Sequence, residues 1–316
     1  MWSINQTKEF EFLFLGLSEI QSVQLPLFLL FLLIYTMTLT GNLLILLLIF
    51  SDSHLHTPMY LFLSNLACVD VFYSSTTSPR MLYDFFSRNK TISLSNCITQ
   101  FFFFFSFTCI ELYLLAAMSY DRYIAICQPL HYIQIMHPKF CAKLASAAWS
   151  FGFLTSMIHT ICTKKLAFCG PNTIYGFFCD LPQLFLLSCT NTFINVLVMF
   201  VVGTFMGSGA LGMIFVPYIQ IFRTVLGIKT REGKLKAFST CTSHLTVVII
   251  FCSTLLFTYF RPTPSTYFSG DRLVSVVYTV VTPLLNPLIY SWRNKDLKEA
   301  LLKTLYGMRG VKVNAF

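Results

Sequence analysis

Long apolar stretches alternate with short polar ones over most of the chain. A helix that crosses the hydrocarbon core of a bilayer needs roughly 20 apolar residues. Seven stretches reach that length: residues 25–50, 59–83, 98–120, 140–161, 193–222, 238–260 and 273–292. The second and seventh carry more polar residues than the others, so we expect them to score lowest on hydropathy. The pattern predicts an all-α membrane protein, a bundle of seven transmembrane helices.

Composition supports this fold class. Of the 316 residues, 55% are hydrophobic and 11% are charged, and the mean hydropathy is +0.68. Soluble domains usually carry about 25% charged residues. No stretch between the spans is long enough for a separate soluble domain, and no internal repeat is apparent. We therefore expect a single seven-helix domain at residues 25–292, between an N-terminal segment at residues 1–24 and a tail at residues 293–316.

The basic residues indicate which way the chain crosses the membrane. With the N-terminus outside, most of the 22 Lys and Arg residues fall at cytoplasmic ends, as the positive-inside rule requires. The net charge of +9 is then a topology signal, and a nucleic-acid-binding surface explains it less well. Asn5 and Asn89 each begin a glycosylation acceptor tripeptide, and both fall outside in this orientation.

The N-terminal segment lacks the basic region, apolar core and cleavage site of a signal peptide, so we expect the first span to act as the insertion signal. At the cytoplasmic end, the leucines of residues 297–305 share one side of a helix and the lysines lie on the other. This pattern predicts a short amphipathic helix that lies along the membrane.

Four of the eleven cysteines fall on the predicted outer face: Cys97, Cys169, Cys179 and Cys189. Disulfides persist in that oxidising environment, and four cysteines leave three possible pairings. A structural zinc site is the alternative, but the four lack the C-x2-C spacing typical of one. We therefore expect disulfides, with the pairing open.

Two carboxylates fall in the middle of predicted spans, Asp70 in the second and Glu111 in the third. Carboxylates at that depth should face the bundle interior, and with Asn42, Ser119 and Asn286 we expect one polar cluster. Two nearby carboxylates can hold a monovalent cation or share a proton. A hydrogen-bonded network without an ion is the alternative.

An acid–base pair, Asp121 and Arg122, lies at the end of the third span, within the run Met118–Cys127. Charges are costly inside a bilayer and cheap at its edge, so the pair marks where the helix leaves the membrane. Such a pair can hold a bundle closed until another interaction replaces it. Pro217 and Pro287 lie inside the fifth and seventh spans, where each removes a backbone hydrogen bond and kinks its helix.

Four motifs follow one another along the chain: LHTPMYLFLSNL at 55–66, MSYDRYIAIC at 118–127, KAFSTCTSHL at 236–245 and PLLNPLIY at 283–290. Together they resemble the motifs of vertebrate olfactory receptors, which are rhodopsin-like G-protein-coupled receptors. The Asp-Arg-Tyr and Asn-Pro-x-x-Tyr elements belong to the larger receptor class, whereas the first and third motifs are specific to odorant receptors. The resemblance runs from Gly41 to the tail and so covers nearly the whole chain.

The resemblance implies a receptor at the plasma membrane, with an extracellular N-terminus, that is not an enzyme. It implies a small volatile odorant as ligand and a stimulatory, olfactory-type heterotrimeric G protein that raises cyclic AMP. The basic residues between 229 and 236 would face that G protein or anionic membrane lipid. The central acidic pair of the family matches Asp70 and Glu111, which makes Na⁺ the one candidate cofactor.

Several residues take individual roles from the resemblance. It pairs Cys97 with Cys179 and Cys169 with Cys189. It assigns the G-protein switch to Asp121, Arg122, Tyr123, Tyr218, Asn286, Pro287 and Tyr290.

The ligand pocket is expected in the extracellular half, between the third, fifth and sixth spans. Phe101, Phe104, Phe105 and Thr108 follow the i, i+3, i+4, i+7 spacing of one helix face. Together with the resemblance, this spacing predicts a lining of Phe104, Phe105, Thr108, Val202, Met206, Leu255 and Tyr259. Side chains that pack in the core or face lipid are the alternative for such a stripe. The set is apolar with two hydroxyls and no basic residue, which predicts a neutral or weakly polar ligand and disfavours a carboxylate.

Three positions depart from the family pattern. Cys252 stands where a tyrosine is usual, Pro217 where a serine is usual, and Gly176 where a histidine is usual. The glycine leaves a metal-assisted odorant site in that loop without support.

A membrane transporter or channel is the alternative function, as is the same receptor fold used as a non-olfactory chemosensor. Transporters often show internal repeats, and none is apparent here. An intramembrane enzyme is less favoured still, because His54, His56, His131 and His137 lie near loops without a metal-ligand pattern.

Overall fold

The structure is a computed structural model that describes residues 10–169, 172–227, 230–260, 269–293 and 295–307. Side chains of residues 232, 236–240, 243, 269, 290–293, 295 and 305–307 lie outside the description. The glycosylation candidate Asn5 lies outside the described residues, and so does the Tyr290 side chain.

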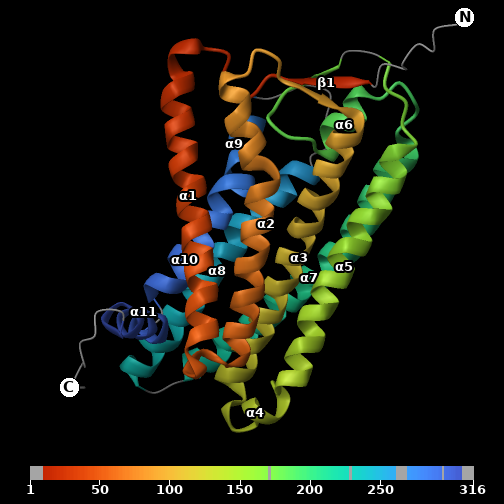
Figure 1. The fold of residues 1–316 in the computed structure, drawn as a ribbon. Helices are drawn as coiled ribbons and strands as arrows, with labels where there is room; N and C mark the ends of the chain where they lie inside the picture. The colour runs from red at the N-terminus through yellow and green to blue at the C-terminus, as the bar shows by residue number, and fades with distance from the viewer. Residues whose placement is uncertain (1–9, 170–171, 228–229, 261–268, 294, 308–316) are drawn as a thin grey trace, which may run out of the picture.

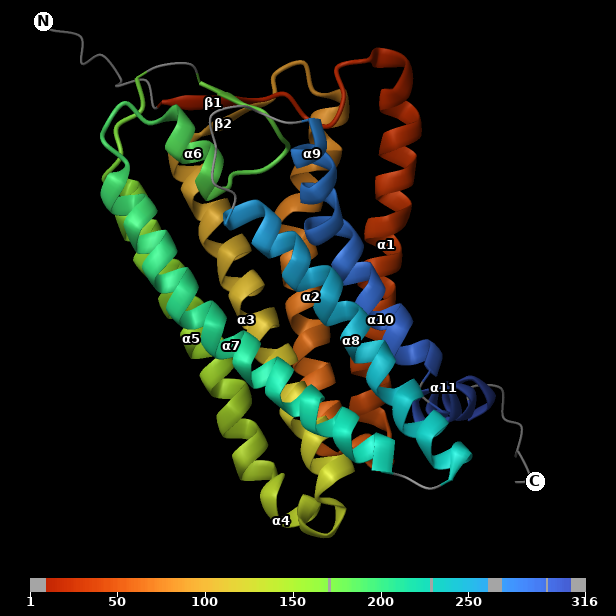
Figure 2. The same cartoon turned by 180° about the vertical axis from the view of Figure 1, so that it is seen from behind.

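Seven helical rods run roughly side by side (Figures 1 and 2). Six are single helices: α1 (Gln21–Ser51), α2 (Pro58–Phe86), α3 (Leu94–Cys127), α5 (Pro138–Lys164), α7 (Phe193–Gly227) and α8 (Arg231–Tyr259). The seventh consists of α9 (Ser269–Val276), the π-helical turn η3 (Val277–Val281) and α10 (Thr282–Arg293). The short helix α11 (Lys295–Gly307) then turns away from the bundle. The chain thus has the seven-helix bundle that the apolar pattern predicts.

Four helical stretches are long and apolar enough to cross a membrane: Gln21–Ser51, Leu94–Cys127, Phe193–Gly227 and Gly270–Ile289. The seventh span is among them, so the expectation that it would score lowest with the second was wrong. The valines between residues 274 and 281 offset its polar residues. Helix α8 begins with basic residues, and within its described residues the apolar part is His244–Tyr259.

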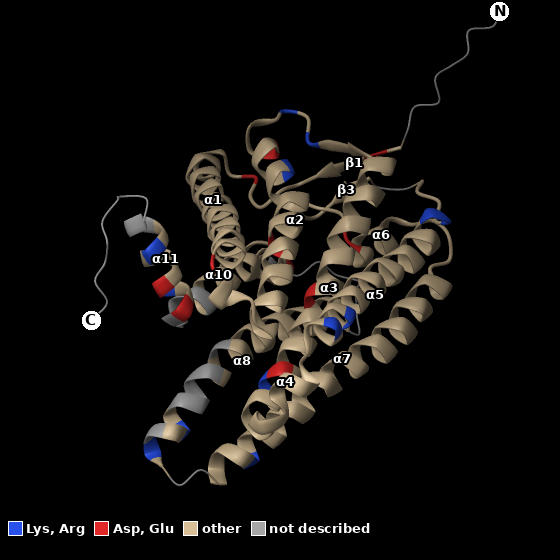
Figure 3. Cartoon of the chain, turned by 60° about the horizontal axis from the view of Figure 1, so that its bottom comes forward, with Lys and Arg blue, Asp and Glu red and all other residues tan. Residues whose placement is uncertain are grey.

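Charged residues lie mainly near the ends of the helices, and most positions between the ends are uncharged (Figure 3). Large apolar side chains instead face outward along the rods. Phe50 of α1 is 74% exposed and Phe205 of α7 is 78% exposed. In water such exposure would be unfavourable, whereas in a bilayer these side chains meet lipid tails. The outer surface therefore fits a protein that crosses the membrane several times.

A small sheet covers the end of the bundle near the N-terminus, which we call the capped end. Its strands β1 (Glu11–Phe14), β2 (Thr91–Ser93) and β3 (Thr173–Ile174) have the spatial order β2-β1-β3. Strand β1 pairs antiparallel with β2 and parallel with β3. Its Phe12 and Phe14 are buried in an apolar cluster that includes Phe101 of α3. The sheet joins the N-terminal segment to two loops far along the chain (Figure 1).

At the opposite end, 3-10 turns η1 (Ser53–Leu55) and η2 (Pro129–His131) and the short helix α4 (Tyr132–Ile135) connect the rods. Close approaches of backbone fix the packing between rods. A Cβ at Gly152 of α5 would lie 3.0 Å from the Ser106 carbonyl oxygen of α3, and one at Gly41 of α1 would lie 3.3 Å from the Pro287 Cβ of α10. Helix α3 runs through the middle of the bundle and contributes side chains to three of the sites described below.

Candidate functional site

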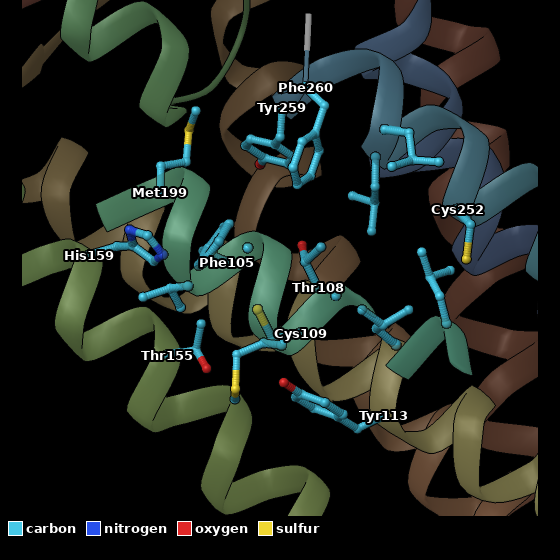
Figure 4. Close-up of a pocket in the computed structure, with 18 residues that line it drawn as sticks. Phe105, Thr108, Cys109, Tyr113, Thr155, His159, Met199, Cys252, Tyr259 and Phe260 are labelled. Carbon is cyan, nitrogen blue, oxygen red and sulfur yellow. The ribbon is translucent and has the colours of Figure 1, made fainter. Parts of the chain in front are cut away.

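A cavity of about 120 Å³ lies between α3, α5, α7 and α8, in the part of the bundle nearer the capped end (Figure 4). Six of the seven residues predicted to line a ligand pocket surround it: Phe105, Thr108, Val202, Met206, Leu255 and Tyr259. Cys252, which replaces a usual tyrosine, also lines the wall. The cavity is apolar with few polar groups, as small-molecule sites usually are.

Phe104 does not line this cavity. Its side chain is fully buried and packs on Tyr73 of α2, with ring centroids 5.2 Å apart, and on Phe178 of the long loop at 4.8 Å. Residues i and i+1 point about 100° apart around a helix, so Phe104 and Phe105 lie at opposite edges of the same stripe. Because α3 is surrounded by other helices, the two edges meet different neighbours.

Helix α5 contributes two pocket residues that the sequence reasoning missed, Thr155 and His159. The expectation of a pocket without a basic side chain was therefore wrong. The two lie one turn apart on α5, which is the spacing of a shared helix face. That spacing is the signal by which they could have been found in an otherwise apolar span.

Asp180 lies above the pocket, directly before the short helix α6 (Leu181–Leu187), and is buried. Its Oδ1 accepts hydrogen bonds from the Tyr259 hydroxyl at 2.9 Å and from the Leu181 N–H at 2.8 Å. Its Oδ2 accepts one from the Tyr278 hydroxyl at 3.1 Å. Burial raises the pKa of Asp180 to about 6, although these three donors oppose the shift. One loop carboxylate thus joins the loop to α8 and to η3.

Below the pocket, Asn286 of α10 brings together the two buried carboxylates. Its Nδ2 donates to Asp70 Oδ1 at 3.0 Å, to Asp70 Oδ2 at 3.1 Å and to Glu111 Oε1 at 3.1 Å. Asn42 and Ser119, also expected in this cluster, bond to backbone carbonyls instead. Three of the five expected residues therefore meet at one point.

The expected switch residues of α3 lie at its end away from the cap. Asp121 is buried and accepts a hydrogen bond at 2.8 Å from the Tyr132 hydroxyl of α4. Within the part of the chain that is described, Arg122 forms no ion pair with Asp121, so the expected direct pair is replaced by the bond to α4. The Tyr123 hydroxyl accepts a long hydrogen bond of 3.4 Å from Gln128 Nε2.

Tyr218 of α7 contacts α8 at the same level. Its hydroxyl lies 2.6 Å from His244 Nδ1, and the two rings are stacked with centroids 5.8 Å apart. A second cavity of about 270 Å³ adjoins this pair between α7 and α8. Asp121 and Arg122 therefore lie near the end of α3 and Tyr218 lies where α7 meets the middle of α8, whereas Asn286 and Pro287 lie in the core of the bundle.

Comparison with known proteins now identifies the family. The family model described as olfactory receptor matches residues 31–307. Olfactory receptor 5B21 of Mus musculus is 49% identical over 95% of this chain and 94% of its own length. Olfactory receptor 5B12 of Homo sapiens is 47% identical over 95% of this chain and 96% of its own, and olfactory receptor 1G1 of Gorilla gorilla gorilla is 47% identical over 96% of each. The chain belongs to the olfactory receptor family.

Membership in this family tests the predictions of fold class, of a non-enzymatic function and of the transporter alternative. The olfactory receptor family has the fold of seven-helix G-protein-coupled receptors, and its members are signalling receptors rather than enzymes. The relatives support an odorant receptor function and do not favour a transporter or channel. The chain is therefore an odorant receptor.

The disulfides of this olfactory receptor have the pairing that the resemblance implied. Cys97 at the start of α3 is bonded to Cys179 of the long loop, and Cys169 is bonded to Cys189 within that loop. The first bond places Asp180, the next residue, over the pocket. Asn89 is exposed in the loop after α2, where an acceptor for glycosylation has to lie.

Proposed function

We propose that this olfactory receptor binds a small, mostly apolar volatile compound in the cavity beneath Asp180. The observation that carries the proposal is the enclosure of one cavity by residues of α3, α5, α7 and α8. In this proposal the capped end faces the extracellular medium at the plasma membrane. Odorants then reach the pocket from the side of the loops, and the signal leaves at the opposite end.

The size of the cavity limits the ligand. An apolar protein cavity of about 150 Å³ binds benzene. The cavity here measures about 120 Å³. The conformation described therefore fits a compound of roughly that size, and larger odorants require movement of α7 or α8.

The signalling step is proposed to be a population shift. A ligand favours the active state only if it binds that state better than the inactive one. Through Tyr259, the pocket and the loop carboxylate Asp180 both contact α8. The same helix carries His244 in its middle, where it contacts Tyr218 of α7. A ligand that repositions α8 therefore changes the surroundings of Arg122, where a G protein of the stimulatory, olfactory type is proposed to bind.

We also propose that Na⁺ binds beside Asp70 and Glu111. Within the described residues, Glu111 Oε2 and Asn286 Oδ1 are buried without a hydrogen-bond partner. Buried oxygens of this kind are costly unless paired, and carboxylate and carbonyl oxygens suit a hard cation. Na⁺ would neutralise part of the negative charge that the two carboxylates bring into the core.

The proposed function is tested by a cyclic AMP assay of the receptor in cells that contain the stimulatory olfactory G protein. We expect at least one small apolar volatile compound to raise cyclic AMP in cells whose surface staining shows the receptor. Cells in which an inhibitory G protein replaces the stimulatory one should not show the increase. Surface-expressed receptor that raises no cyclic AMP across a diverse panel of small volatiles would contradict the proposal.

A further inference from the structure

His159 is the polar side chain of the pocket whose hydrogen bonds are unaccounted for. It is 3% exposed, and its ring lies against the cavity, edge-on to Phe105 with centroids 5.1 Å apart (Figure 4). Across the described residues, neither ring nitrogen has a hydrogen-bond partner, whereas the backbone carbonyl accepts from Thr163. Because a buried charge without a partner is costly, the ring is neutral and carries one N–H donor and one bare nitrogen.

The other hydroxyls of the pocket have already donated their protons to the protein. The Thr108 hydroxyl donates to the Phe104 carbonyl at 2.9 Å and the Thr155 hydroxyl donates to the Phe151 carbonyl at 2.7 Å. The Tyr259 hydroxyl donates to Asp180 at 2.9 Å.

Tyr113 lies at the far end of the pocket from Tyr259 (Figure 4). The Thr108, Thr155 and Tyr259 hydroxyls therefore offer a ligand lone pairs but no proton. This distinction decides which ligand groups depend on His159. A carbonyl oxygen only accepts hydrogen bonds, so it needs a donor, and the remaining nitrogen-bound donor in the wall is the imidazole N–H. An alcohol is less dependent, because its own proton can go to a threonine or tyrosine oxygen. A carboxylate would have to leave water for an apolar site.

We propose that His159 is a specificity-determining residue that donates its N–H to the carbonyl oxygen of the odorant. The receptor then prefers ketones, aldehydes and esters to hydrocarbons of the same shape. The inference rests on the proposed function, because it requires the ligand to occupy this cavity. It adds a chemical class to a site that otherwise selects by size and apolar contact.

The test uses three probes of one skeleton that suit the size of the cavity: cyclopentanone, cyclopentanol and cyclopentane. Purified full-length receptor in lipid nanodiscs is titrated with each probe, and the shift in melting temperature gives its apparent affinity. We expect wild type to bind cyclopentanone about tenfold more tightly than cyclopentane, the ratio expected for one net hydrogen bond. His159→Phe, which keeps a ring but has no nitrogen, should abolish that ratio.

Two further variants separate the role of the N–H from that of shape. His159→Gln keeps an N–H donor and should retain a preference for the ketone. Ile161→Val changes an exposed side chain of the same helix outside the pocket lining and should also retain it. Should His159→Phe fail to fold, His159→Leu serves in the same comparison.

The outcomes distinguish this inference from the function on which it rests. A folded His159→Phe that still prefers cyclopentanone to cyclopentane overturns the role of His159, and so does a wild type that binds both equally. If none of the three probes shifts the melting temperature of wild type, the cavity does not bind compounds of its own size, and the proposed pocket fails together with the inference.

Discussion

The sequence alone predicts some residues of the pocket and misses others. Phe105 and Thr108 follow from helical spacing, but the same spacing wrongly included Phe104, because a periodic stripe does not say which neighbour each edge meets. His159 and Asp180 were missed for a different reason. A single polar residue in an apolar span, or an acid in a long loop, gains its role only from neighbours that are distant in sequence.

Asp180 gives this receptor a pH dependence outside the membrane-spanning helices. Burial raises its pKa from 3.8 to about 6, with Tyr259, the Leu181 N–H and Tyr278 opposing the shift. Between these values the folded receptor binds this proton more tightly than the unfolded chain, so the stabilisation is present below about pH 4 and is lost as the pH rises to about 6. We expect the melting temperature of wild type, relative to Asp180→Asn, to fall over that window and then level off. A difference that does not change with pH would show that Asp180 titrates normally.

At the scale of helices and strands, local pattern accounts for the rods but not for their contacts. The lengths of the apolar stretches alone predict all seven helices, because a segment that crosses the bilayer must hydrogen-bond its own backbone N–H and C=O groups. The strand Glu11–Phe14 was not predicted, because its alternation of Glu and Phe is only a few residues long and its partners at residues 91–93 and 173–174 are remote in sequence. Pairing of this kind depends on the loops that the disulfide Cys97–Cys179 holds in place.

The contact between α3 and α5 depends on a glycine. A Cβ at Gly152 would lie within 3.0 Å of the Ile110 amide nitrogen and of the Ser106 carbonyl oxygen. Gly152→Ala should therefore force the helices apart and lower stability by about 1–3 kcal/mol, the usual cost of overpacking. The measurement is the melting temperature of purified receptor.

Gly209 of α7 provides the matched control for that substitution. It is exposed, and a Cβ there meets no atom within 4 Å. Gly209→Ala should leave the melting temperature unchanged or raise it slightly, because alanine favours helix more than glycine does. Equal melting temperatures for the two variants would mean that the α3–α5 contact tolerates a side chain at Gly152.

For the whole molecule, three sites follow one another along α3: the pocket under Asp180, the acidic pair at Asn286, and the charged end of the helix. Helix α3 contributes Thr108, Glu111 and Asp121 to these three levels in turn. Composition and hydropathy predicted the seven-helix fold, and the family motifs predicted most of the residues at these three sites. The packing that links one level to the next is visible only in three dimensions.

The acidic pair in the middle of the bundle can be tested by exchanging Na⁺ for another cation. If Na⁺ binds beside Asp70 and Glu111, replacing NaCl with choline chloride at constant ionic strength should lower the melting temperature of wild type. Asp70→Ala removes one carboxylate of the site and should abolish the dependence on Na⁺. A wild type whose stability is the same in both salts would exclude a bound sodium ion as a stabilising element.

The central claim is that an odorant acts from inside the cavity between α3, α5, α7 and α8. Two glycines of α7 test it in a matched way. Gly207 lines the cavity and Gly209 is exposed outside its lining, and a Cβ at either meets no atom within 4 Å. Gly207→Leu should fill the pocket, whereas Gly209→Leu should add a side chain only to the outer surface.

The deciding measurement is the cyclic AMP response of both variants to an agonist of wild type, at equal surface staining. We predict that Gly207→Leu raises the agonist concentration needed for half-maximal response by about tenfold or more, which corresponds to a binding loss of about 1.4 kcal/mol or greater. Gly209→Leu should respond as wild type does. Equal responses of the two variants would contradict the account, because the odorant would then act from somewhere other than this cavity.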